Sequence, residues 1–126
     1  MATVLLVDDE ADVRGVLRET LELDGHTVFE APSGKAALTR LAEREFDLVL
    51  SDIRMPEGDG WSLLRELRRR DPRRPPVILI TGFCDATAEE ARKRGAQELV
   101  LKPCDVLGLL ETVNAYVVPP SVPTGP

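Results

Sequence analysis

Polar side chains suited to phosphate or metal chemistry follow four short apolar runs of this chain. The set comprises Asp8, Asp9, Asp52, Thr81 and Lys102. Each residue alone has an ordinary explanation, because aspartate and threonine often cap helices and a lysine is usually solvated. The set as a whole does not. If the runs are neighbouring strands of a parallel sheet, all five side chains meet at one edge of it.

Together these side chains could transfer a phosphoryl group. Three carboxylates in one place repel one another unless a cation lies among them. Their charge is about −3, and Lys102 with one Mg²⁺ returns about +3, which leaves a site able to accept a phosphoryl dianion. The metal, the Lys102 ammonium and the Thr81 hydroxyl would each bind a phosphoryl oxygen. Asp52 would be the nucleophile and would become an acyl phosphate.

The chain alternates between apolar runs and helical patterns, as the positioning of these residues requires. Strands are predicted at 4–7, 26–30, 47–51, 77–80 and 98–101. The first helix carries an apolar stripe of Val13, Val16, Leu17, Thr20 and Leu21, and later helices are expected around 34–41, 63–67, 86–93 and 109–113. Ser33 is a candidate N-cap, and Gly25 and Gly95 are candidate helix ends. Five strands alternating with five helices predict an α/β fold, a doubly wound parallel sheet with helices on both faces.

Composition limits the class of protein. A chain of 126 residues with 43% apolar and 30% charged residues fits one globular domain. No apolar run approaches the ~20 residues of a bilayer span. No signal peptide is recognisable, so we expect a cytoplasmic protein without membrane contact. The net charge of −6 argues against direct nucleic-acid binding, and the arginines within 68–74 are expected to form a solvated helix end.

A few further residues have side chains that could take part in chemistry. Cys84 and Cys104 are interpreted as free cytosolic thiols, with a redox link between them as the alternative. His26, the only histidine, is expected to have a structural or surface role away from the acidic residues. Trp61 is expected to pack in the ordinary way, or else to lie close enough to a bound metal for its fluorescence to report on it.

Four segments of the chain together resemble a known family. They are Val7-Asp8-Asp9-Glu10, the stretch 52–60, Ile80-Thr81-Gly82 and Leu101-Lys102-Pro103. In order and spacing they resemble the signatures of response regulator receiver domains of bacterial two-component systems, over about residues 3–117. The resemblance implies a flavodoxin-like sheet of strand order 2-1-3-4-5. It also implies a signalling phosphoacceptor that is not otherwise an enzyme.

The resemblance also assigns roles to residues. Asp52 is the phosphoacceptor, and Thr81 and Lys102 bind the phosphoryl group. Mg²⁺, with Mn²⁺ as the alternative ion, is held by Asp9 directly, by Asp8 through water, by Asp52 and by the backbone carbonyl of Arg54. The Lys102–Pro103 peptide is expected to be cis. The phosphoryl group would come from a histidine kinase or a histidine phosphotransfer protein.

Several positions depart from the family pattern. The switch residue paired with Thr81 is usually aromatic and is Leu99 here, and the aromatic residue that often follows the Lys-Pro pair is Cys104. Arg54 and Phe83 stand where other members carry side chains that orient an attacking water. These departures leave the phosphorylation chemistry intact and affect its lifetime and readout.

The end of the chain is rich in proline. We expect a receiver domain over residues 1–118 and a linker or tail over 119–126. An output domain after residue 118 is one expectation and a free-standing regulator is the other. A homodimer through the fourth helix, fifth strand and fifth helix is a further expected interaction.

Two other functions fit parts of the pattern. An aspartyl-phosphate phosphohydrolase of the dehalogenase-like kind would share the nucleophilic aspartate. It would, however, need an Asp-x-Asp after its first strand, whereas Arg54 follows Asp52 at that spacing. A pseudo-receiver would keep the fold without being phosphorylated. The intact acidic set argues against it, and Leu99 argues for it.

Overall fold

The computed structural model describes residues 2–55, 59–82, 87–101 and 106–117. Five parallel strands form one sheet in the order β2-β1-β3-β4-β5. The strands are β1 (Thr3–Val7), β2 (Thr27–Ala31), β3 (Leu48–Asp52), β4 (Val77–Thr81) and β5 (Glu98–Leu101). The helices are α1 (Ala11–Leu23), α2 (Gly34–Glu43), α3 (Gly60–Arg70), α4 (Ala88–Lys93) and α5 (Val106–Tyr116). The predicted fold class and strand order are confirmed.

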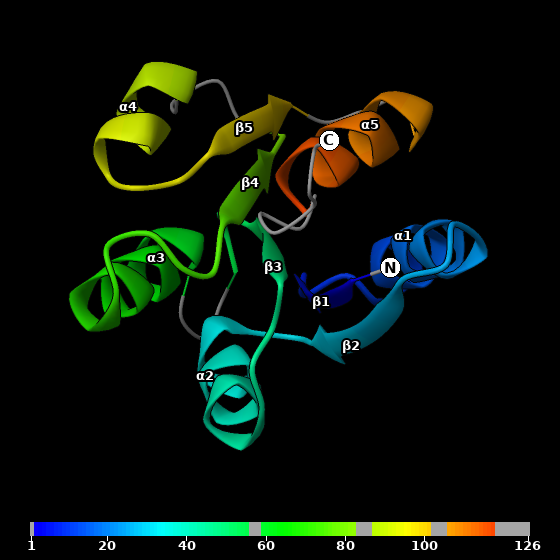
Figure 1. Cartoon of the computed structure of the whole chain (residues 1–126), viewed down its shortest axis with the longest axis horizontal. Helices are drawn as coiled ribbons and strands as arrows, with labels where there is room; N and C mark the ends of the chain where they lie inside the picture. Colours follow the sequence, from blue (N-terminus) through cyan, green and yellow to red (C-terminus); the bar gives the residue numbers. More distant parts are fainter. Residues whose placement is uncertain (1, 56–58, 83–86, 102–105, 118–126) are drawn as a thin grey trace, which may run out of the picture.

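Helices cover both faces of the sheet (Figure 1). Along β1, Leu5 and Val7 belong to the core that α2 and α3 cover, whereas Val4 and Leu6 belong to the core that α1 and α5 cover. This alternation follows from the two-residue period of a strand. The central strands β3 and β4 are buried at every position, as expected for a sheet covered on both sides.

Local signals in the sequence account for the helix boundaries. The Ser33 hydroxyl accepts a hydrogen bond from the Ala36 amide at 3.1 Å, as its N-cap role requires. Gly25 and Gly95 have φ angles of 94° and 104°, a conformation that favours glycine after a helix. The predicted ends of β2, β3 and β4 were each one residue short of the observed ends.

Two expectations about the helices need correction. On α1, Leu17 and Leu21 are buried, but Val16 is 57% exposed because it lies at the margin of the apolar stripe. On α3, Arg69 and Arg70 are exposed as expected. Arg68, by contrast, is only partly exposed and donates to the carbonyl oxygens of Gly95 at 2.8 Å and Pro75 at 2.7 Å. Burial lowers the pKa of Arg68. The aliphatic part of an arginine side chain can pack in this way while its charged group is hydrogen-bonded.

Two further expectations concern single aromatic residues. Trp61 is partly buried against the α2–α3 core, and the guanidinium of Arg94 lies 4.5 Å from the centre of its ring. The ordinary packing expected for Trp61 is therefore present. His26 is buried and hydrogen-bonded at the amino ends of the strands, which gives it the structural role that was expected.

Within the described residues, no helix has the length and apolar content that crossing a bilayer would need.

Candidate functional site

The carboxyl ends of β1, β3 and β4 bring the predicted site residues to one edge of the sheet. Asp52 is the last residue of β3 and Thr81 the last of β4, and Asp8 follows β1 directly. The register pairs Val7 with Ser51 and Asp52 with Ile80, so the three strands end almost level. The sequence pattern of a polar residue after each apolar run therefore corresponds to a real convergence in space.

The acidic side chains form a group that could hold a metal ion. Carboxylate oxygens of Asp8, Glu10 and Asp52 all lie within 4.8 Å of one another. Asp8 is 1% exposed and Asp52 is 7% exposed, whereas Glu10 lies at the surface. Clustered carboxylates are costly without a cation, and oxygen ligands are those that Mg²⁺ prefers. The donor set therefore fits a hard divalent ion.

The backbone holds Asp52 in a crowded place. The Ser51 hydroxyl donates to the Asp52 carbonyl oxygen at 2.9 Å, and the Ile53 amide donates to the Ile80 carbonyl at 3.0 Å. The Gly60 amide, at the start of α3, donates to the Ile53 carbonyl at 2.7 Å. A Cβ at position 60 would lie 2.5 Å from the Asp52 carbonyl oxygen. The first residue of α3 therefore packs directly on the backbone of the candidate nucleophile.

The remaining predicted residues divide into three groups. Thr81 is fully buried beside β3. Asp9 and Arg54 are exposed on the connections after β1 and β3. Lys102, Pro103, Cys104, Phe83 and Cys84 lie outside the described residues, so the expected cis Lys102–Pro103 peptide and the cysteine alternatives are not assessed.

Leu99 lies in the middle of β5 opposite Leu79. It is partly buried and packs on the core that α2 and α3 cover. The position expected to carry an aromatic switch is therefore filled by an aliphatic side chain in ordinary packing contact.

Glu10 is the residue of the acidic group that the sequence reasoning left out. It is the third of three consecutive acidic residues and the N-cap residue of α1. Its amide donates to Oδ1 of Asp8 at 2.9 Å, and its carboxylate belongs to the group within 4.8 Å. An acidic residue directly after an Asp-Asp pair was the available signal.

The geometry first defines a class of protein: a flavodoxin-like α/β domain with an acidic, metal-competent site at the carboxyl edge of its sheet. Comparison with known proteins then identifies the family. A sequence model of the response regulator receiver domain matches residues 4–114. The chain belongs to this family, as the four signature segments indicated.

Known relatives agree with this assignment. The response regulator protein FleR of Pseudomonas aeruginosa is 38% identical over 115 residues, which span 91% of this chain and 24% of FleR. The regulatory protein AtoC of Escherichia coli is 43% identical over 104 residues, 82% of this chain and 22% of AtoC. This chain therefore spans about a quarter of the length of these curated relatives.

Solved structures share the fold. The receiver domain of the Francisella response regulator 1452 superposes with a TM-score of 0.86 at 29% identity, covering 93% of this chain and 97% of that one. A receiver domain protein described as CheY-like, from Methanospirillum hungatei, has a TM-score of 0.84 at 27% identity, covering 93% of this chain and 94% of that one.

Proposed function

We propose that Asp52 accepts a phosphoryl group from a phosphohistidine of a histidine kinase or a histidine phosphotransfer protein, in a reaction that depends on Mg²⁺. The observation that carries the proposal is the convergence of Asp8, Glu10 and Asp52, with carboxylate oxygens within 4.8 Å, beside the buried Thr81. A site of this kind neutralises and orients a phosphoryl group. The protein is in this proposal a signalling phosphoacceptor.

The residues that would hold the ion are Asp8, Asp9, Asp52 and the backbone carbonyl of Arg54, and the geometry adds Glu10 to this set. When bound, the ion supplies positive charge beside the incoming phosphoryl oxygens. Mn²⁺, which takes similar oxygen ligands, would serve in its place.

The transfer forms one bond and breaks one. A carboxylate oxygen of Asp52 attacks phosphorus while the phosphorus–nitrogen bond of the donor breaks, and the electron pair of that bond stays on the imidazole nitrogen. Thr81 ends the adjacent strand and would donate its hydroxyl proton in a hydrogen bond to a phosphoryl oxygen. Lys102, by its place in the signature segments, would neutralise another oxygen.

We further propose that Thr81 and Leu99 carry the change from the site to the surface of α4, β5 and α5. Thr81 drawn toward the phosphoryl group would leave space that Leu99 can enter. A leucine buries less area than an aromatic ring and has no polar atom to change partners, so the two states should differ less in population.

The same surface is our candidate for contact with a second copy. Leu101 on β5 and Leu107 on α5 are 56% and 70% exposed. We keep residues 1–118 as the receiver domain and 119–126 as a linker, with an output domain beyond it as one proposed arrangement. The cytoplasmic location that we propose rests on the expectation that the two cysteines are free thiols.

The intact mass of the protein tests the proposal. After incubation with acetyl phosphate and Mg²⁺ we expect one phosphoryl adduct that hydroxylamine removes and chelation of the metal prevents. Asp52→Asn should gain none. An adduct of the same yield on Asp52→Asn would place the acceptor elsewhere, and a wild type that is never modified would point to a pseudo-receiver.

A further inference from the structure

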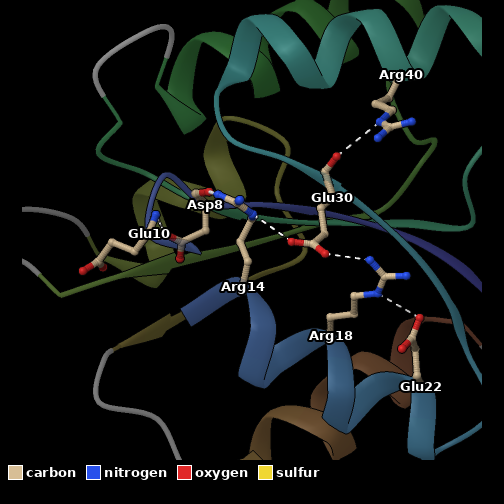
Figure 2. Close-up of polar contacts among 7 residues, drawn as sticks. All are labelled: Asp8, Glu10, Arg14, Arg18, Glu22, Glu30 and Arg40. Atoms are coloured by element: carbon tan, nitrogen blue, oxygen red, sulfur yellow. Dashed lines mark hydrogen bonds and ion pairs between the residues drawn. The ribbon is translucent and has the colours of Figure 1, made fainter. Parts of the chain in front are cut away.

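Arg14, on the first turns of α1, reaches the backbone of the acidic turn (Figure 2). Its Nη1 donates to the carbonyl oxygen of Asp8 at 2.6 Å, and its Nε donates to Oε1 of Glu30 at 2.9 Å. The Arg14 side chain is only 16% exposed and that of Glu30 is 26% exposed. One partly buried guanidinium thus joins the acidic turn to β2.

Glu30 is itself held in place from several sides (Figure 2). Its second carboxylate oxygen accepts from Arg18 Nη1 at 2.7 Å, and its backbone carbonyl accepts from Arg40 Nε at 3.2 Å. The hydrogen bonds from Arg18 and then Arg14 lower the pKa of Glu30, because they favour its charged form. Charge-assisted bonds of this kind fix direction as well as distance.

The hydrogen bond from Arg14 fixes the orientation of the peptide group between Asp8 and Asp9. The Asp8 amide donates to Ala31 at 3.1 Å, and the Glu10 amide donates to the Asp8 carboxylate at 2.9 Å. The Asp8 carbonyl is held by Arg14. A peptide group is planar, so fixing this carbonyl fixes the plane that leads into Asp9.

We propose that Arg14, aligned by Glu30, is a positioning residue that preorganises the Asp8–Asp9–Glu10 turn for the divalent ion. The inference rests on the proposed phosphoacceptor function and names a residue outside the ligand set. Arg14 acts through the backbone and touches neither the ion nor the phosphoryl group. Loss of a group that orients metal ligands typically weakens metal binding by about 10- to 100-fold.

Calorimetric titration of the unphosphorylated protein with Mg²⁺ tests the positioning role. We expect Arg14→Gln to raise the Kd about tenfold and Glu30→Gln to raise it similarly. The double variant should have the same Kd for Mg²⁺ as Arg14→Gln alone, because both changes disrupt the same contact of Arg14 with the acidic turn. Arg18→Gln is the matched control, since Arg18 binds the same Glu30 but bonds to Glu22 rather than to the acidic turn. Its Kd should change less than about twofold.

A second readout separates positioning from a general loss of structure. The initial rate of phosphorylation by acetyl phosphate is measured as a function of Mg²⁺ concentration. If Arg14 positions the ligands, saturating Mg²⁺ restores the maximal rate of Arg14→Gln; a damaged site would stay slow at any concentration. Should Arg14→Gln fail to fold, Glu30→Gln against Arg18→Gln makes the same comparison.

The failures of the two proposals are distinct. A wild type that binds no Mg²⁺ and gains no phosphoryl group overturns both the proposed function and the positioning role of Arg14. The positioning role of Arg14 alone is overturned if the wild type binds Mg²⁺ and is phosphorylated, and if Arg14→Gln and Glu30→Gln have the same Kd as Arg18→Gln.

Discussion

Asp8 and Asp9 are adjacent in the sequence, but their surroundings give them different tasks. Asp8 is 1% exposed, and its Oδ1 accepts the Glu10 amide at 2.9 Å, so part of its carboxylate holds the turn together. Asp9 lies at the surface. Direct coordination by Asp9 and an outer role for Asp8 stay a prediction, because the carboxylates that lie within 4.8 Å of one another are those of Asp8, Glu10 and Asp52.

The two alanine variants should therefore separate metal binding from stability. We expect Asp9→Ala to lose more Mg²⁺ affinity than Asp8→Ala, because a direct ligand contributes more than one acting through water. Without Mg²⁺, Asp8→Ala removes the buried acceptor of the Glu10 amide and also relieves repulsion among the clustered carboxylates, so its unfolding free energy should change more than that of Asp9→Ala. Mg²⁺ titrations and urea unfolding check both rankings. Equal losses of affinity would contradict the division of roles.

Arg54 stands two residues after the proposed acceptor and is exposed. Hydrolysis of an acyl phosphate needs a water held in line behind phosphorus. A guanidinium donates hydrogen bonds only and cannot act as a base for that water. Phe83, the other flanking residue by sequence, is apolar.

We therefore expect a long-lived phosphoprotein, with Arg54→Asn shortening its lifetime by supplying an amide oxygen that can orient water. The decay of the adduct after removal of the phosphodonor gives the rate. A wild-type adduct lost within seconds, or a rate unaffected by Arg54→Asn and by Phe83→Glu, would contradict this account.

The first residue of α3, Gly60, packs closely on the backbone of Asp52. Alanine is favoured over glycine inside a helix by about 1 kcal/mol, so propensity alone predicts that Gly60→Ala stabilises the protein. A Cβ there would, however, lie 2.5 Å from the Asp52 carbonyl oxygen and 2.9 Å from the Ile53 Cα, both backbone atoms with little freedom to move. Overpacking of this kind typically costs about 1–3 kcal/mol.

We expect steric crowding to determine the stability change at Gly60 and helix propensity to determine it at Gly15, where an added Cβ meets nothing within 4 Å. Gly60→Ala should lower the unfolding free energy by about 1–3 kcal/mol and slow phosphorylation, because α3 can recover only by pushing on Asp52. Gly15→Ala should raise the unfolding free energy by about 0.5–1 kcal/mol and leave phosphorylation unchanged. Urea unfolding of both variants decides, and stabilisation by Gly60→Ala would refute the packing argument.

The sequence was informative about strands because apolar runs ending in a polar residue mark both an element and its carboxyl end. Asp52 and Thr81 were therefore placed correctly, although each proved to be the last residue of its strand rather than the residue after it. Glu10 was missed because its place beside Asp8 and Asp52 follows from the turn between β1 and α1, which no periodicity encodes. Partial burial of Arg68 was missed for a similar reason, since its partners are backbone carbonyls of other segments.

At the scale of the whole molecule, His26 ties together three parts of the chain at the end of the sheet opposite the acidic site. Its Nδ1 accepts from the Ala2 amide at 3.2 Å, and its Nε2 lies 2.8 Å from Oδ1 of Asn114 on α5. The Asn114 amide nitrogen in turn donates to Asp24 at 2.9 Å. The ring is therefore best described as the tautomer with its proton on Nε2.

We expect His26→Phe to fill the same space but to leave the Ala2 amide and Asn114 without this partner. Unsatisfied buried groups cost about 1–3 kcal/mol each, so the unfolding free energy should fall by roughly that amount. The rate of phosphorylation should stay the same because the substitution lies at the amino ends of the strands. Urea unfolding and the acetyl phosphate assay measure the two effects, and an unchanged midpoint would contradict the role of His26.

Glu30 should contribute to the pH dependence of stability. Its pKa is lowered from the ordinary value of 4.5 by Arg18 and Arg14, so the folded state favours its charged form. The contribution is present above the unfolded pKa and is lost as the pH falls through the lower, folded pKa. Glu30→Gln should be less stable than wild type at pH 7, with the difference shrinking below about pH 4.5. Urea unfolding across that range tests this, and a difference that grows in acid would reverse the sign.

The hydrogen bond from Arg40 to the Glu30 carbonyl has a consequence for self-association. β2 is an outer strand of the sheet, and such a strand offers unpaired backbone groups to any other chain that can lie alongside it. The neighbouring Ala31 carbonyl faces inward, where it accepts from Asp8, so the Glu30 carbonyl faces outward, where the Arg40 guanidinium covers it. An approaching strand would have to displace this cation to form a ladder. The Arg40 side chain thus opposes the pairing of another chain's strand with the edge of β2.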